Sequence, residues 1–216
     1  MNPFLNESRQ SPRQYIDLET NVIVNHSNES TGLNVSSLGL MTAEDVVLAT
    51  MTDDELAAVG DMIRVGIGAY EEAGTVLAST FRRLDRLKGV YEAPGSIYIV
   101  ARDKRGDQES RDTHVIGGAG LGPLHGLSPA EGLGEIRDLV VRPEWRGHGI
   151  GARLLKRCID EAKRLGYQRL YLEATPQMEQ AQKLFIRYGF RPVTTGSARV
   201  IPGESMPCYY ILETLS

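Results

Sequence analysis

The sequence has few cysteines, no long apolar run and little net charge, and each shortage excludes a class of protein. Its 216 residues include two cysteines, Cys158 and Cys208, which cannot build the disulfide framework of a small secreted domain. Its apolar runs fall far short of the roughly 20 residues that a membrane helix needs. The net charge of −4 argues against a nucleic-acid binder, and the four scattered histidines lack metal-ligand spacing. We therefore expect no nucleic-acid partner, no membrane partner and no metal.

The N-terminal part differs in composition from the rest. Its first residues contain neither a basic region nor an apolar core, so they do not resemble a secretory signal, and we expect a cytoplasmic location. Without secretion, its Asn-x-Ser sequences match the glycosylation pattern by composition alone. We interpret residues 1–40, rich in Asn, Ser and Gln, as a polar arm that is disordered or docked on a partner. Residues 41–216 then form one domain.

Charge is also divided unevenly along the chain. Residues 1–61 carry ten acidic and two basic groups, a net −8, so the remainder sums to +4. Between residues 142 and 169, eight basic groups stand against three acidic ones. A local cationic patch in an acidic protein fits a polyphosphate ligand, whereas each of these charges taken singly fits a solvated helix face.

Apolar periodicity alternates between strand spacing and helix spacing. Short β-prone runs occupy residues 46–49, 97–101, 115–121, 135–142, 169–173, 191–195 and 208–212. Helical spacing follows Thr52, recurs over 76–87 and 151–165, and follows Thr175. Thr52 with Glu55 matches a capping box, and Thr175 before Pro176 matches an N-cap followed by an N1 proline. Strands mixed with helices in this way indicate a layered α/β domain.

The most informative segment is Arg146-Gly147-His148-Gly149-Ile150-Gly151, which follows a predicted strand and opens a predicted helix. Helix N-termini present unpaired N–H groups, and glycines let a phosphate approach the backbone closely. The segment therefore indicates a cradle for a pyrophosphate. It lacks the Gly-Lys-Ser/Thr of a Walker loop and the third glycine of a dinucleotide fingerprint. Taken alone, the segment also fits a purely structural interpretation, in which a glycine-rich turn lets the helix pack and binds no ligand.

The neighbouring residues resemble the acetyl-CoA-binding motif of the GNAT N-acetyltransferase superfamily. The similarity runs through Glu135-Ile136-Arg137-Asp138-Leu139-Val140-Val141-Arg142-Pro143-Glu144-Trp145 and continues into the glycine loop. Residues 172–175 and 181–190 resemble the next strand and helix of that superfamily. The resemblance implies a single GNAT-like α/β domain with a mixed, splayed β-sheet flanked by helices.

The resemblance also implies how acetyl-CoA, the expected co-substrate, is held. The backbone of Leu139, Val140 and Val141 would pair with the pantetheine arm. An N–H near Val141 would polarise the thioester carbonyl. The pyrophosphate would lie against the amides of Arg146, Gly147, His148, Gly149, Ile150 and Gly151. Thr175 would add one more cofactor contact.

The acceptor amine must lose a proton before it attacks, and Glu135 matches a position where the superfamily often has an acidic base. The alternative for Glu135 is a strand-end carboxylate in solvent or in a salt bridge. Many relatives use a tyrosine in the second helix as the acid, but Phe185 stands there in this chain. Tyr188 and Tyr209 are the candidate acids, although Tyr188 also falls on the apolar stripe of its helix.

The predicted reaction is direct transfer of acetyl from acetyl-CoA to a primary amine of a small molecule or peptide. Phe185 keeps open a non-catalytic acyl-CoA-binding sensor. A protein acyltransferase or a longer-chain acyltransferase also fits the sequence. The expected partner is the amine acceptor, and a homodimer is left open.

Overall fold

The computed structural model describes residues 15–16, 23–24, 45–68, 83–105, 115–125, 127–193 and 208–213. The chain divides into two units, Met1–Leu40 and Met41–Ser216. In the first unit, β1 (Tyr15–Ile16) pairs antiparallel with β2 (Ile23–Val24).

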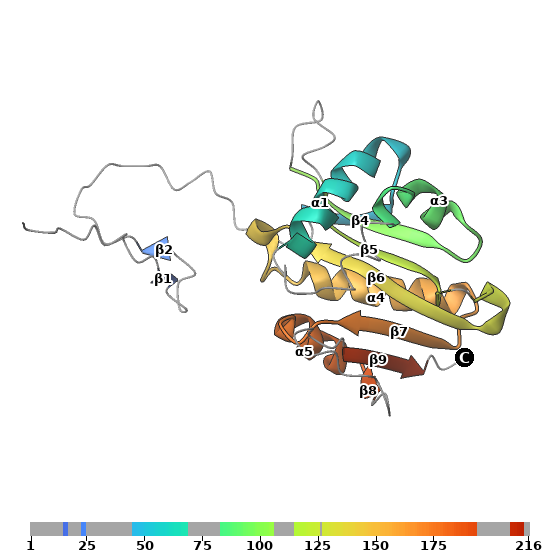
Figure 1. The fold of residues 1–216 in the computed structure, drawn as a ribbon. Helices are drawn as coiled ribbons and strands as arrows, with labels where there is room; N and C mark the ends of the chain where they lie inside the picture. Colours follow the sequence, from blue (N-terminus) through green and yellow to red (C-terminus); the bar gives the residue numbers. More distant parts are fainter. Residues whose placement is uncertain are drawn as a thin grey trace, which may run out of the picture. The chain divides into compact units, whose positions relative to one another are not determined.

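The second unit contains a seven-stranded mixed sheet in the order β3-β4-β5-β6-β7-β9-β8 (Figure 1). The strands are β3 (Val46–Thr50), β4 (Ile97–Asp103), β5 (Val115–Pro123), β6 (Leu133–Val141), β7 (Arg169–Ala174), β8 (Arg191–Val193) and β9 (Cys208–Glu213). Neighbouring strands are antiparallel except β6 and β7, which run parallel. The prediction of a mixed sheet flanked by helices is confirmed.

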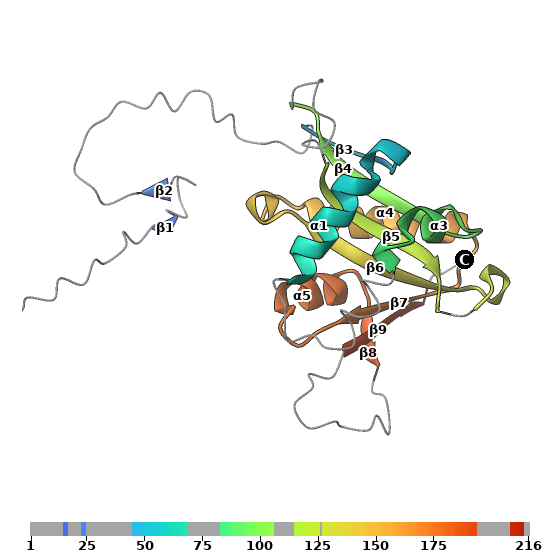
Figure 2. The same cartoon turned by 45° about the horizontal axis from the view of Figure 1, so that its top comes forward.

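Helices cover both faces of this sheet (Figure 2). They are α1 (Leu56–Gly68), α3 (Leu87–Glu92), α4 (Ile150–Arg164) and α5 (Glu179–Arg187). Side chains of α1 and α3 share one buried cluster with Tyr98 and Val100 of β4. Side chains of α4 and α5 share a second, larger cluster with Ile136 and Leu172 of the sheet. None of the helices described is long and apolar enough to cross a membrane.

The start of α1 follows the predicted capping box. The Glu55 carboxylate accepts the Thr52 amide at 2.8 Å, and a 3₁₀ turn (Asp53–Glu55) leads into the helix. Arg102 of β4 reaches the same carboxylate with two nitrogens, at 2.6 and 2.8 Å. This partly buried, charge-assisted contact joins the turn before α1 to the sheet.

Two helices differ from their sequence-based predictions. Thr175 is not the N-cap of the second helix, because α5 begins at Glu179 with Met178 as its N-cap. The Met178 amide donates to Thr175 O at 3.0 Å, which closes a turn before the helix can start. The helix predicted over 76–87 lies mostly outside the described residues, and the short helix α3, which was not predicted, begins at Leu87.

Candidate active site at the split between two parallel strands

β6 and β7 pair over only the first part of β6. Their ladder runs from Leu133 opposite Arg169 to Ile136 opposite Leu172, although β6 continues to Val141. Over residues 137–141, the edge of β6 that faces β7 therefore has no neighbouring strand in the described structure. An open edge can accept an extended ligand as an added strand.

A bulge in β6 accompanies the split. Where β5 has one residue between Gly118 and Gly120, β6 has two, Asp138 and Leu139. Asp138 has a φ of 52°, and it is the one non-glycine residue in the described part of the chain with a positive φ. Aspartate tolerates this region better than most residues, and a bulge bends its strand and re-aims the residues after it.

The backbone beyond the bulge turns toward the open edge at Val141. Arg142 donates its amide to Ile116 O of β5 at 3.0 Å, so alternation along the strand points the groups of Val141 away from β5. Val141 O accepts Arg146 Nε at 3.2 Å, in agreement with this direction. The Val141 N–H therefore faces the split, on the strand segment 139–141 that the resemblance singled out.

The glycine loop next to this edge supplies unpaired amides. Gly147 and Gly149 have φ values of 83° and 74°, and Gly149 is the N-cap of α4 without any side-chain cap. The amides of residues 147–152 have no acceptor within the described residues. His148 is exposed, and its Nδ1 lies 3.0 Å from Arg146 O. Free N–H groups at the positive end of a 15-residue helix form an anion-binding site.

Thr175 lies at the end of β7 that has parted from β6. Its side chain is only 1% exposed, and its Oγ1 has no hydrogen-bond partner among the described residues. A buried hydroxyl without a partner costs about 1–3 kcal/mol. A ligand atom in the split would offer this hydroxyl a partner.

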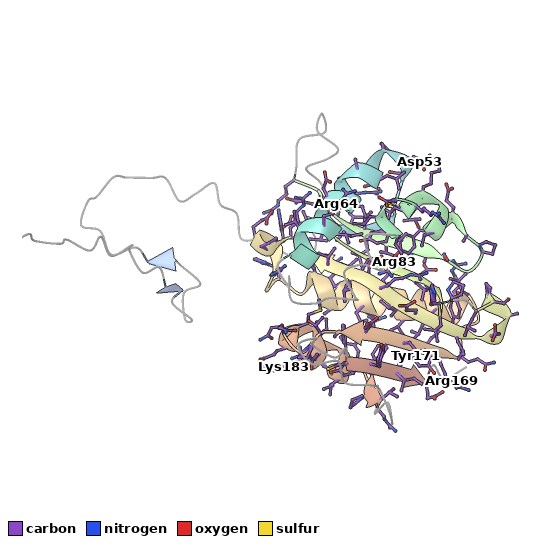
Figure 3. All side chains as sticks on the ribbon, viewed as in Figure 1. Asp53, Arg64, Arg83, Arg169, Tyr171 and Lys183 are labelled. Carbon is purple, nitrogen blue, oxygen red and sulfur yellow. The ribbon has the colours of Figure 1, made fainter. Side chains whose placement is uncertain are left out.

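Glu135, Glu173 and Tyr209 lie on the face of the sheet opposite α4 and α5. Ile136 and Leu172 point into the cluster shared by those helices, so their neighbours in the strands point the other way. Glu135 pairs in register with Tyr171, and Glu173 pairs with Tyr209. Figure 3 shows Arg83 on the side of α3 and Tyr171 on β7, with β6 between them.

The charges of these groups shift one another's pKa values. Glu173 keeps contact with solvent, but neighbouring protein removes part of its water shell, and this together with the negative charge of Glu135 raises the pKa of Glu173. Arg83 opposes that rise. Partial burial and the charge of Glu173 raise the pKa of Tyr209. Glu135 also forms an ion pair with Arg137 at 3.3 Å. The structure thus brings Glu135 and Tyr209 together through Glu173.

Tyr188 is placed elsewhere. It is the C-cap of α5 and packs against the cluster shared by α4 and α5. Phe185 is buried in the same cluster, where its ring meets the Tyr210 ring edge-on with centroids 5.8 Å apart. Cys158 is fully buried there too, and burial together with the charge of Glu161 raises the pKa of its thiol to about 12, which makes it unreactive.

Sequence reasoning missed four residues of this site. Glu173 could have been found from the parallel register of the two strands, because it lies two residues beyond Tyr171 on the same face. Asp138 stands out in the sequence only as a member of the motif, and no local pattern signals its positive φ. Arg83 and Tyr91 contact Asp138 across 55 and 47 residues of sequence, a distance that local patterns do not carry.

The split sheet, the bulged strand and the amide loop at a helix N-terminus place an open strand edge next to an anion-binding helix end in one α/β domain. The sequence profile described as "Acetyltransferase (GNAT) family" matches residues 70–190. The chain therefore belongs to the GNAT acetyltransferase family and is an acyltransferase.

Individual relatives agree with this assignment. The uncharacterized N-acetyltransferase YjgM of Escherichia coli is 27% identical over 150 residues, which cover 68% of this chain and 83% of that protein. The aminoalkylphosphonate N-acetyltransferase of Salmonella typhimurium is 32% identical over 81 residues, covering 38% of this chain and 53% of the relative. The structure of a GNAT superfamily phosphinothricin acetyltransferase from Sinorhizobium meliloti in complex with AcCoA superposes with a TM-score of 0.61. At 20% identity, it covers 79% of this chain and 89% of its own, and it supports the fold.

Proposed function

We propose that the protein transfers acetyl from acetyl-CoA to a primary amine of a small molecule or peptide, by direct attack and without a covalent enzyme intermediate. The observation that carries this proposal is the unpaired edge of β6 running directly into the amide loop at the start of α4. One such track suits a ligand with an extended amide-bearing arm and a pyrophosphate. We assign the activity to residues 41–216 and leave the arm 1–40 outside the reaction.

The cofactor would lie along this track. The amides of Gly147, His148, Gly149, Ile150 and Gly151 would hold the pyrophosphate, whereas the Arg146 amide, which the sequence also suggested, already donates to Pro143 O at 3.2 Å. The backbone of residues 139–141 would pair with the pantetheine arm, and the Thr175 hydroxyl would gain the partner that it lacks. The solved relative from Sinorhizobium meliloti, which is in complex with AcCoA, supports this choice of cofactor.

The acceptor would approach from the face that carries the two carboxylates. Its nitrogen attacks the thioester carbon while the Val141 N–H binds the carbonyl oxygen, which becomes negative. Glu135, directly or through a water, takes the proton that the amine must lose. Glu173 shares the same face, and its raised pKa suits it to receive that proton in turn.

The leaving group is handled on the same side. The carbon–sulfur bond breaks, and CoA leaves as a thiolate that takes up a proton. We assign Tyr209 as the donor because it lies on the same face as Glu135 and Glu173, and a tyrosine is protonated at neutral pH. Tyr188 packs in the opposite cluster, so it has no part in this scheme.

Thiol release from acetyl-CoA with a panel of amines tests the proposal. We expect turnover with at least one amine, and a loss of about 10²–10⁴ in kcat for Glu135→Gln at saturating amine. Glu213→Gln is the matched control, since Glu213 is an exposed carboxylate at the end of β9. Full turnover by Glu135→Gln would remove Glu135 from the role of base.

The second candidate is a non-catalytic acyl-CoA-binding sensor, and Phe185 favours it because it carries no proton to donate. The aminoalkylphosphonate relative supports a small-molecule acceptor instead. Binding of acetyl-CoA without turnover on any amine would establish the sensor. Adding a lysine peptide and a longer acyl-CoA to the same panel separates protein acetylation and longer-chain transfer from small-molecule acetylation.

A further inference from the structure

The bulge residue Asp138 is tied down by side chains from two other elements. Its carboxylate is 1% exposed, and it accepts the Tyr91 hydroxyl at 2.6 Å and Arg83 Nη2 at 2.8 Å. Its backbone carbonyl accepts the Tyr98 hydroxyl at 3.3 Å. The bulge is therefore held at its carboxylate from the side of α3 and at its carbonyl from β4.

Two glycines of β5 make room for these contacts. A Cβ on Gly120 would lie 2.1 Å from the Tyr91 hydroxyl oxygen, and a Cβ on Gly118 would lie 2.5 Å from the Tyr98 ring. The two rings meet edge-on, with centroids 4.9 Å apart. Glycine weakens a strand and is found where another group approaches its backbone closely. Here the side chains of both tyrosines cross directly over β5 to reach the bulge in β6.

The bulge decides which backbone groups face the split. It inserts one residue into β6, and a shift of one residue turns every later group to the other side of its strand. The Val141 N–H faces the split only while the extra residue stays in place. A positive φ at a non-glycine residue persists where its surroundings over-determine it, and the contacts on Asp138 do so.

We propose that Asp138, Tyr91 and Arg83 form a positioning group that locks the bulge and thereby aims the Val141 N–H at the thioester carbonyl. This inference rests on the proposed acetyl transfer. None of the three residues touches the reacting atoms in the scheme, so each acts through the backbone of β6.

The group also joins the acceptor side to the cofactor side. The charge of Arg83 is felt by Glu173, where it opposes the rise in pKa. Tyr91 is a constant donor, because burial and the negative charge of Asp138 raise its pKa well above the ordinary value and keep its hydroxyl protonated. The Tyr91 hydroxyl therefore serves as a permanent hydrogen-bond donor to the Asp138 carboxylate.

The test compares Tyr91→Phe, Asp138→Asn and Asp138→Ala with the matched control Tyr167→Phe. Tyr167 is also buried and also donates its hydroxyl to an oxygen, Gly95 O at 2.8 Å, but away from the bulge. Each variant is measured for kcat, for the dissociation constant of CoA, and for amide hydrogen exchange of a peptide spanning residues 136–142 with CoA bound.

We expect Tyr91→Phe to lower kcat about tenfold to a hundredfold, as displacement of a reacting group does. CoA affinity should fall by a smaller factor than kcat, because the phosphate loop is untouched and only the pairing of residues 139–141 with the pantetheine arm is loosened, while exchange in residues 136–142 rises. Asp138→Asn keeps an acceptor oxygen and tolerance of positive φ, so it should lose less than Asp138→Ala. Tyr167→Phe should change none of the three readouts.

The proposal is overturned if Tyr91→Phe retains wild-type kcat, if exchange in residues 136–142 stays unchanged, or if kcat and CoA affinity fall by the same factor, as in general loss of structure. Its failure is distinct from failure of the proposed function, which appears as a wild-type protein that transfers acetyl to no amine. In that case the exchange measurement on the CoA complex still decides whether Tyr91 locks the bulge.

Discussion

Gly149→Ala tests the amide loop through backbone conformation alone. Gly149 has a φ of 74°, and a Cβ built on it meets nothing within 4 Å, so an alanine there is opposed by no clash. The cost is that of the left-handed region, about 1–2 kcal/mol for a residue with a Cβ. At 1.36 kcal/mol for each factor of ten, this corresponds to roughly a 5- to 30-fold effect on an equilibrium constant.

Thermal unfolding and titration calorimetry with CoA measure where this cost falls. If the loop keeps its shape, the free energy of unfolding drops by about 1–2 kcal/mol and CoA affinity is retained. If the loop relaxes, stability is retained and affinity falls by the corresponding factor. Gly151→Ala is the stability control, because its Cβ would make ordinary 3.8 Å contacts and alanine favours a helix by about 0.5–1 kcal/mol. Unchanged stability together with unchanged affinity in Gly149→Ala would refute the reasoning.

Three further substitutions probe other parts of the domain. Glu161→Gln should cost about 0.5–1 kcal/mol at pH 7, since the hydrogen bond from Arg164, partly opposed by burial, lowers the pKa of Glu161 below 4.5. The stabilisation by Glu161 is present above pH 4.5 and is lost as the pH falls through the lowered pKa. If urea titrations at the lowest pH still show the wild type to be more stable than Glu161→Gln, the assignment is contradicted. Thr175→Val should stabilise the free protein by about 1 kcal/mol in calorimetry and should weaken CoA binding. A variant that is both more stable and a tighter CoA binder, or both less stable and a weaker CoA binder, would count against a ligand at this hydroxyl. Gly120→Ala should cost about 1–3 kcal/mol in chemical unfolding because it overlaps the Tyr91 hydroxyl, whereas Gly89→Ala, with open space around it, should not destabilise.

Strong local patterns predicted much of the fold. The helix expected over 151–165 is observed over Ile150–Arg164, because its apolar stripe repeats over several turns and a glycine follows it. The capping box at Thr52 and Glu55 is confirmed, since a cap depends only on residues three positions apart. The short helix α3 escaped prediction because six residues that include Gly89 carry too little periodicity.

The start of α5 shows why a local rule fails. Thr175 and Pro176 match the preferred order at a helix start, but the Thr175 carbonyl accepts both the Met178 amide and Gln182 Nε2. These contacts form a turn first and delay the helix to Glu179. Contacts within this eight-residue segment, rather than the Thr-Pro pattern alone, therefore set where α5 begins.

The proposed phosphate loop could be suggested from the sequence because its glycines and its helix are contiguous, whereas the proposed acceptor face could not. Glu135, Glu173 and Tyr209 come from three strands, and their proximity depends on two registers that no local pattern encodes. The same limit applies to the Asp138 group. The sequence suggested which strand carries the proposed chemistry, and the structure added which neighbours contact that strand at its bulge.

Phe185 need not imply an inactive protein. The Tyr210 hydroxyl lies in the same cluster, but it donates to Gln182 Oε1 at 3.0 Å, and Gln182 in turn donates to the Thr175 carbonyl. Tyr210 is therefore engaged in bracing the turn before α5. A thiol with an ordinary pKa of about 8.5 can leave as a thiolate at modest cost, so the transfer depends less on an acid than on removing the amine proton and stabilising the carbonyl oxygen. In the proposed mechanism both of those tasks belong to β6, with Glu135 before the bulge and Val141 after it, so the geometry of the bulge weighs more in that mechanism than the missing hydroxyl.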